Sequence, residues 1–241
     1  EEMIRYHDNL ESIRNNLDYD IDGSVFKVNQ IKERTALGIR SRSPRWAIAA
    51  KFKAQQVTTK VTSIIASIGR TGAITPVAQL EPVNVGGVNV TNATLHNQDE
   101  VDRKDVRIGD TVILQRAGDV IPEIVKVILE KRDKKSVQYL LPKKCPSCEK
   151  TIYRPKGESV ARCQNLSCPA QIKGRIIHFI SKSALNIDGF GEKLVEQLVE
   201  KNIIQQVDDI FKLTFEKLEK LDRMAEKSAN NILAAINDSK K

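Results

Sequence analysis

Four cysteines constrain this chain more than any other feature, because they are its whole complement and lie close together. They follow the spacing Cys145-x2-Cys148-x14-Cys163-x4-Cys168 in a chain of 241 residues. Two close pairs separated by a short excursion can place four thiolates in a tetrahedron around one Zn²⁺. A site with four cysteine ligands has no open coordination position, so its zinc is structural. The spacing predicts a small zinc knuckle whose flanks carry the function.

The alternative interpretation of the cysteines is a pair of disulfides in a secreted protein. Disulfide scaffolds are usually short and rich in cysteine, whereas most of this chain has none. No apolar run approaches the roughly 18 residues of a membrane span, and no secretion signal is visible. Reduced thiols and the lack of an export signal predict a cytoplasmic protein with no membrane partner.

Composition favours several domains and a polyanionic partner. Hydrophobic residues make up 40% of the chain but aromatic residues only 5%, which favours several small cores over one large core. The formal net charge is +8, and basic residues gather near the cysteines: Lys131, Arg132, Lys134, Lys135, Lys143, Lys144, Arg154 and Lys156. Such a charge is typical of nucleic-acid-binding proteins, although a merely solvated basic surface has the same composition.

The first fifty residues mix helical and extended patterns. Residues 2–16 fit a helix with a partial apolar face, and residues 24–28 fit a strand. The basic stretch 32–45 contains glycine and proline and predicts an exposed loop. Residues 46–52 predict a second, buried strand or a short helix.

From residue 56 the apolar period becomes two, which is typical of strands. Val57, Thr59, Val61, Ser63 and Ile65 are expected on one side of the first of these strands. Glycines and prolines then punctuate the chain at short intervals as far as residue 127. Short β segments with frequent turns predict a small barrel.

Beyond the cysteines the period becomes helical. Two apolar stripes have helical spacing: Leu194, Val195, Leu198 and Val199, then Ala229, Ile232, Leu233 and Ile236. The segments 188–193 and 222–227 are similar to each other, and each precedes one of these stripes. The similarity predicts a duplicated helix–turn–helix unit.

Gly189 and Gly191 precede the first of these helices and can form a phosphate-binding nest of backbone N–H groups. The second copy has Arg223 and Ala225 at the corresponding positions. If that turn needs a positive φ, Ala225 adds strain, which makes a second nest doubtful.

Four basic residues are candidates for anion contacts. Lys27 and Lys51 each interrupt an apolar run, and the pattern alone favours a solvent-facing lysine over one that points at a bound anion. Arg70 and Arg116 lie at predicted turns of the barrel. Arginines there either meet nucleic-acid phosphates or are only solvated, and the pattern leaves both interpretations open.

Six segments, in this order, resemble bacterial NAD⁺-dependent DNA ligases. They are Asp22-Gly-Ser-Val-Phe-Lys27, Ser43-Pro-Arg-Trp-Ala-Ile-Ala-Ala-Lys-Phe52, Gly69-Arg-Thr-Gly-Ala-Ile-Thr-Pro76, Ala93-Thr-Leu-His-Asn97, Arg116-Ala-Gly-Asp-Val-Ile-Pro122 and the four-cysteine knuckle. The resemblance extends over essentially the whole chain.

The resemblance implies a multidomain α+β protein of the bacterial cytoplasm. It implies the end of an adenylation (nucleotidyltransferase) domain in residues 1–52 and a β-rich OB-fold barrel in 53–137. A small four-cysteine zinc finger would follow in 138–171, and the first part of an all-α helix-hairpin-helix region in 172–241. The family seals nicks in duplex DNA through lysyl-AMP and DNA-adenylate intermediates, with NAD⁺ and Mg²⁺, and a monomer is expected.

The resemblance also implies roles for individual residues. Lys27 and Lys51 would contact the adenylate phosphates, and Asp22 would shape the same pocket. The residues expected to meet DNA are Arg70, Thr71, Arg116, Val120, Ile121, Gly189 and Gly191.

The chain departs from the family at the nucleophile, which is the lysine of a Lys-x-Asp-Gly motif. No such motif is present; Asn186-Ile-Asp-Gly189 comes nearest, with Asn in place of Lys. We therefore expect no catalytic residue in the chain and no self-adenylation. The nicotinamide-binding region, the later hairpins and the BRCT domain usual in the family are also missing, which predicts an internal piece of a ligase. The alternative is a non-catalytic duplex-DNA-binding module; Lys27 and Lys51 favour the ligase.

Overall fold

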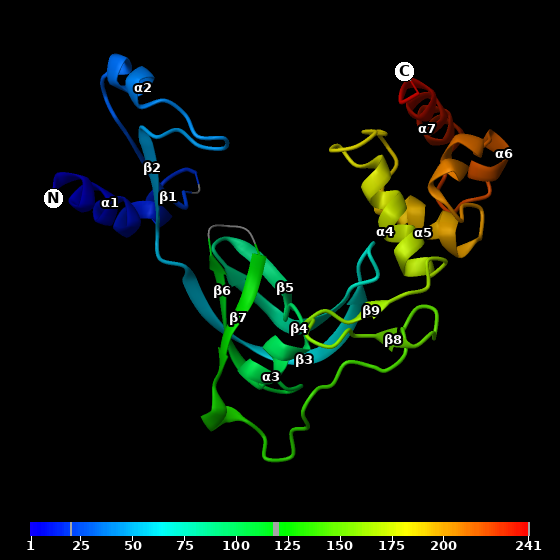
Figure 1. The fold of residues 1–241 in the computed structure, drawn as a ribbon, viewed down its shortest axis with the longest axis horizontal. Helices are drawn as coiled ribbons and strands as arrows, with labels where there is room; N and C mark the ends of the chain where they lie inside the picture. The colour runs from blue at the N-terminus through cyan, green and yellow to red at the C-terminus, as the bar shows by residue number, and fades with distance from the viewer. Residues whose placement is uncertain (20, 118–120, 241) are drawn as a thin grey trace.

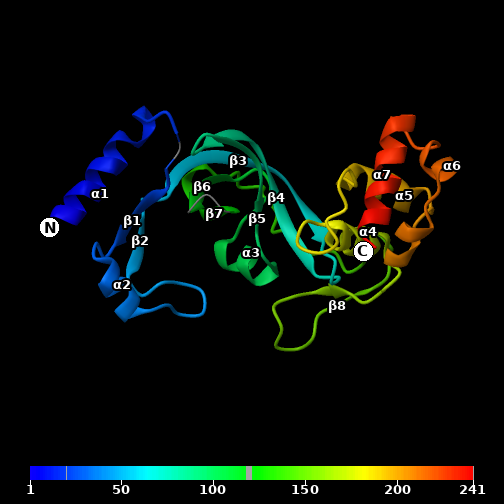
Figure 2. The same cartoon turned by 90° about the horizontal axis from the view of Figure 1, so that it is seen from above.

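The computed structural model describes residues 1–19, 21–117 and 121–240, and the chain forms three lobes in sequence order (Figure 1). A mixed N-terminal lobe and a helical C-terminal lobe lie on opposite sides of a central β-barrel, and the view from above shows the same order (Figure 2). Among the described residues, no helix is both long enough and apolar enough to cross a membrane.

The N-terminal lobe is a two-stranded antiparallel sheet with helices beside it. Its elements are α1 (Glu2–Ile13), η1 (Arg14–Asn16), β1 (Gly23–Lys27), α2 (Ile31–Leu37) and β2 (Ala47–Lys51). Two predictions for this lobe were wrong. Part of the expected loop is α2, because its Lys, Glu, Arg, Ala and Leu are good helix formers and Gly38, at φ 70°, ends the helix. The strand β2 is largely exposed, and Ile48 keeps 66% of its surface accessible.

The barrel is closed, as the alternating pattern predicted. Its strands are β3 (Gln55–Ile68), β4 (Ile74–Val85), β5 (Val88–Thr94), β6 (Thr111–Ala117) and β7 (Ile121–Val127), with α3 (Gln98–Lys104) between β5 and β6. They close in the order β3-β4-β5-β7-β6. Val61, Leu80, Leu114 and Ile124 are among the residues that fill the interior.

A β-bulge at Thr62 changes which side of β3 faces inward. Val61 pairs with Leu80 and Ser63 with Gln79, so β3 has one residue more than β4 at this point. The side-chain alternation shifts by one there, so that Ile64 is buried and Ile65 is 45% exposed. The prediction that Ile65 continues the inward-facing series is therefore wrong.

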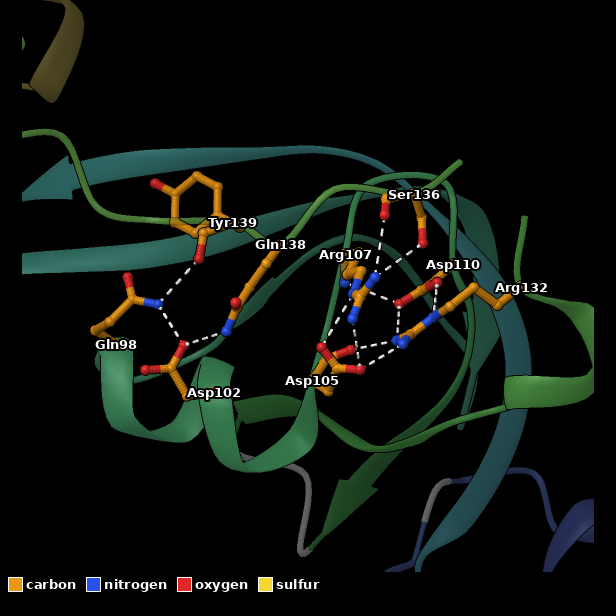
Figure 3. Close-up of polar contacts among 9 residues, drawn as sticks. All are labelled: Gln98, Asp102, Asp105, Arg107, Asp110, Arg132, Ser136, Gln138 and Tyr139. Carbon is orange, nitrogen blue, oxygen red and sulfur yellow. Dashed lines mark hydrogen bonds and ion pairs between the residues drawn. The ribbon is translucent and has the colours of Figure 1, made fainter. Parts of the chain in front are cut away.

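After the barrel, η2 (Leu129–Lys131) leads into a connector, residues 132–141, that polar contacts fasten to the barrel (Figure 3). Arg132 bonds to Asp105 and Asp110, and Arg107 Nη1 donates to the carbonyl of Ser136 at 3.0 Å. Further along, Gln98 Nε2 donates to the carbonyl of Tyr139 at 3.0 Å. The path of the chain from barrel to cysteines is thus fixed by side chains of the barrel.

The last part of the chain is helical. A short hairpin of β8 (Ile152–Tyr153) and β9 (Arg162–Cys163) precedes α4 (Pro169–Ile180), α5 (Glu192–Glu200), η3 (Val207–Lys212), α6 (Phe215–Leu218) and α7 (Glu226–Asp238). The two predicted apolar stripes pack into one core. Leu194, Val195 and Leu198 of α5 are buried there with Ala229, Ile232 and Ile236 of α7.

Candidate functional site

The four cysteines meet at one point beside the barrel. Cys145 Sγ lies 3.8 Å from Cys168 Sγ, Cys148 Sγ lies 3.5 Å from Cys163 Sγ, and all four sulfurs lie within 4.8 Å of one another. A tetrahedral zinc with Zn–S bonds of about 2.3 Å has sulfurs about 3.8 Å apart. The sulfur spacing and the donor type therefore fit one structural Zn²⁺ with no open position.

Two tight turns place the sulfurs. In the first turn, the Cys145 N–H donates to Lys150 O at 2.8 Å and the Glu149 N–H donates to Cys145 O at 2.9 Å, with Glu149 at φ 58°. In the second, the Cys168 N–H donates to Asn165 O at 3.0 Å. The helix α4 begins directly after Cys168 with Pro169, a residue that suits the first turn of a helix.

The surroundings of the thiols suit a cation between them. Burial raises the pKa of Cys145 to about 12 and also raises the pKa of Cys163. Burial acts in the same direction on Cys148, but hydrogen bonds from the Asn165 side chain and the Lys150 backbone outweigh it and lower the pKa of Cys148 to about 6. Because burial disfavours uncompensated thiolates, a divalent cation is the partner that lets all four ionise together.

The candidate adenylate contacts all lie in the N-terminal lobe, with Lys51 and Asp22 at one end of the β1–β2 ladder and Lys27 at the other end. Gly23 pairs with Lys51 and Lys27 with Ala47, so both lysines lie on the same exposed face of the β1–β2 sheet. Lys51 Nζ forms an ion pair with Asp22, and this hydrogen bond lowers the pKa of Asp22. The two strands approach each other so closely here that a Cβ on Gly23 would lie only 2.3 Å from Ala50 O, and glycine is the residue that fits.

The residues expected to meet DNA do not form one cluster. Arg70 and Thr71 are exposed in the turn between β3 and β4. This turn lies beside the zinc loop, the segment 145–168 that contains the four cysteines, and Arg162 Nη1 of that loop lies 3.4 Å from Thr71 Oγ1. Arg116 pairs with Gln55 at the opposite end of β3 and lines a small pocket of 20 Å³ with Asp22. Val120 lies outside the described residues, and Ile121 begins β7.

The two turns of the predicted duplication have the same backbone signs. Gly189 has φ 76° and Gly191 has φ −79°; Arg223 has φ 59° and Ala225 has φ −83°. The position that needs a positive φ is therefore the first of each pair. The strain expected at Ala225 is absent and falls on Arg223.

Two residues beside the zinc loop and one at the start of the connector were missed by sequence reasoning. Gln171 is buried and donates to Cys163 O, Gly174 packs on the backbone of Arg70, and Arg132, interpreted as part of the basic surface, is largely buried against Asp110. The first two follow the last cysteine within one helical turn or two, but no local pattern marks them.

Comparison with known proteins gives consistent matches along the chain. Residues 1–55 match the NAD-dependent DNA ligase adenylation domain, residues 58–136 the NAD-dependent DNA ligase OB-fold domain, and residues 144–170 the NAD-dependent DNA ligase C4 zinc finger domain.

The relatives that match this chain over almost its whole length are named DNA ligase. A DNA ligase of Syntrophus aciditrophicus is 51% identical over 240 residues, which is 100% of this chain and 36% of the relative. DNA ligases of Desulfosudis oleivorans and Methylococcus capsulatus are 52% and 53% identical over 99% of this chain and over 35% and 36% of their own lengths. The chain thus spans about a third of these relatives. The chain belongs to the NAD-dependent DNA ligase family and contains sequence that matches three of its domains, namely the adenylation domain, the OB-fold domain and the C4 zinc finger domain.

Proposed function

We propose that this chain is part of an enzyme that seals nicks in duplex DNA through lysyl-AMP and DNA-adenylate intermediates. In the proposal, residues 1–52 complete an adenylation domain, 53–137 and 138–171 are the OB-fold and zinc finger, and 172–241 begin a helix-hairpin-helix region. The whole enzyme uses NAD⁺ and Mg²⁺ and acts as a monomer on nicked duplex. The zinc stabilises its finger and takes no part in the chemistry.

The observation that carries the proposal is the shared face of Lys27 and Lys51 with Asp22 beside it. Each step of nick sealing adds charge to phosphate oxygens, and fixed cations stabilise that charge. Lys51 pairs with Asp22 at this face, which places its ammonium group beside that carboxylate. A module that only grips duplex DNA has no use for such a face.

A non-catalytic duplex-DNA-binding module is the second candidate, because the exposed Arg70 in the β3–β4 turn would serve a grip on duplex DNA without any adenylate pocket. Both candidates predict no covalent AMP on this chain after incubation with NAD⁺ and Mg²⁺. Intact-mass measurement would detect such an adduct, which would contradict our expectation that no nucleophile is present.

Binding to a pre-adenylated nick separates the two candidates. The ligase proposal predicts that the chain binds a duplex with a 5′-adenylated nick roughly tenfold tighter than the same nick with a plain 5′-phosphate. The preference should disappear in Lys51→Ala and persist in Lys60→Ala, an exposed lysine of β3. Equal binding of both nicks by the unmodified chain would favour the non-catalytic module.

A further inference from the structure

The turn that presents Arg70 is joined to the zinc loop by backbone hydrogen bonds. The Cys163 N–H donates to Gly72 O at 2.8 Å, and the Ile74 N–H donates to Ala161 O at 2.8 Å. A β-bridge between Ala73 and Arg162 lies between these two bonds. The β3–β4 hairpin therefore extends onto the strand that contains a zinc ligand.

Side-chain packing reinforces this connection. Gly72 is buried at φ 80°, and a Cβ there would lie 2.3 Å from Cys163 O and 2.9 Å from Gln171 Nε2. Gln171 is 2% exposed, and its Nε2 donates to Cys163 O at 2.8 Å and to Asn165 O at 3.1 Å. The buried Gln171 amide thus binds two carbonyls of the zinc loop and fills the space that a side chain on Gly72 would need.

The helix after the last cysteine supports the turn from another side. A Cβ on Gly174 would lie 3.0 Å from Arg70 Cα, 3.1 Å from Arg70 Cβ and 3.2 Å from Arg70 N. Gly174 lies inside α4, where alanine is intrinsically the better helix former. The close approach of the Arg70 backbone explains a glycine at this position.

The zinc loop and the hairpin also share a core. Ile74, the first residue of β4, is 1% exposed and clusters with Cys145, Cys163 and Cys168. The turn between Ile68 and Ile74 is therefore enclosed by the zinc loop below it and α4 beside it, while the Arg70 side chain remains exposed.

We propose that Gln171 and Gly174 are positioning residues for Arg70. They transmit the geometry of the zinc loop to the turn, so that zinc binding and the contact of Arg70 with a DNA phosphate are energetically coupled. The inference rests on the proposed function in one respect, namely that Arg70 meets DNA. The coupling between zinc loop and turn stands on the contacts themselves.

The first test uses Gly174→Ala in the zinc-loaded chain. The added methyl group displaces the Arg70 backbone, so affinity for nicked duplex should fall roughly tenfold and the log–log salt slope should shrink by about one phosphate contact. In an Arg70→Ala background, Gly174→Ala should cause no further loss. The matched control is Gly69→Ala in the same turn, whose Cβ would meet only Ala73 O at 3.7 Å and should leave binding unchanged.

The second test needs no DNA. Hydrogen exchange at the Cys163 and Ile74 amides should accelerate in Gln171→Leu and after zinc chelation, while the Val61 amide, which donates to Asp110 O in the barrel, should stay protected. Unchanged exchange at Cys163 and Ile74 would overturn the coupling. An equal loss of affinity from Gly174→Ala with and without Arg70 would overturn the positioning role. If Arg70→Ala has no effect on binding, the DNA contact of Arg70 is refuted. The hydrogen-exchange result would then decide by itself whether the zinc loop and the turn are coupled.

Discussion

Arg132 holds the carboxylate of Asp110 at two points: Nε donates to Oδ1 at 2.9 Å and Nη2 to Oδ2 at 2.8 Å (Figure 3). The Asp110 side chain is 1% exposed and the Arg132 side chain 12%. The Arg107 N–H donates to the same carboxylate at 2.8 Å. This pair joins the start of the connector to the turn before β6.

Removal of Arg132 should destabilise the barrel strongly. Arg132→Met leaves the Asp110 carboxylate buried without a cation, which costs about 3–5 kcal/mol in comparable sites. Urea unfolding should show a lower midpoint. The control is Arg103→Met, which breaks the exposed pair with Glu100 and should leave the midpoint nearly unchanged. Similar shifts for both variants would contradict the structural role of Arg132.

Acid should weaken the same network through Asp105. Hydrogen bonds from Arg107 and Arg132 hold the pKa of Asp105 below its ordinary value of 3.8. A depressed carboxyl pKa stabilises the fold at pH above the unfolded value, and that contribution is lost as the pH falls through the folded value. Stability should therefore decline below about pH 4 more steeply in the unmodified chain than in Asp105→Asn.

Asparagine is a suitable replacement because Asp105 has φ 47°, a left-handed conformation that asparagine tolerates. Thermal unfolding from roughly pH 2.5 to 6, a range that brackets the titration of a depressed carboxyl, would compare the two chains. Parallel pH profiles would show that another carboxylate dominates the acid response.

Metal analysis should find one zinc per chain. Cys163→Ser removes one thiolate and should lower the zinc content, and chelation should make the segment 141–171 sensitive to proteases because small metal domains fold on their metal. The barrel core, from Val61 to Ile124, should resist cleavage under the same conditions. A zinc-free chain with a protected segment would contradict the metal assignment.

The two glycines before α5 should respond differently to alanine. Gly189→Ala places a side chain at φ 76° and should destabilise the helical lobe by about 1–2 kcal/mol. Gly191→Ala should have little effect on stability, because φ is −79° and nothing lies within 4 Å of its Cβ. Arg223→Gly should stabilise the second turn. Denaturant unfolding measures all three, and equal costs at both glycines would contradict the assigned conformations.

Arg70 and Arg116 should contribute separately to DNA affinity, since they lie at opposite ends of β3. Each phosphate contact contributes about −0.9 to the log–log slope of affinity against salt. Arg70→Ala and Arg116→Ala should each reduce the slope by roughly one unit without a change in sequence preference, and the double variant should lose about two. Binding that is independent of salt would mean that neither arginine meets a phosphate.

Much of the site was predictable where short-range chemistry decides it. The four cysteines are close in sequence, so their spacing alone predicted that they meet, and the two-residue period of β3 predicted a barrel strand. The pattern failed where a distant partner decides the outcome. Arg132 stands in a basic run, and only the fold brings Asp105 and Asp110 to it.

Backbone conformation was a second limit. The two-residue period of the sequence predicted Ile65 on the same side as Val61, but the bulge at Thr62 shifts the alternation by one, so that Ile64 is the buried residue. The turn before α7 has its positive φ at Arg223 and not at Ala225, which composition alone does not reveal, because the two positions differ from glycine equally.

The same bulge lets one strand belong to two cores. Before Thr62 the inward residues Val57 and Val61 line the barrel; after it Ile64 completes the barrel, and Ala66 and Ile68 lie against the cysteine cluster. If Thr62 were paired as an ordinary strand residue, the alternation would run on from Val61 through Ser63, Ile65 and Ser67, and the zinc finger would meet Ile65 and Ser67 in place of Ala66 and Ile68. The bulge takes up Thr62, so deletion of Thr62 would restore one-to-one pairing with β4 and leave Ile64, Ala66 and Ile68 on the face that they occupy now. The bulge thus lets β3 contain one residue more than its partner and still present apolar side chains to both modules.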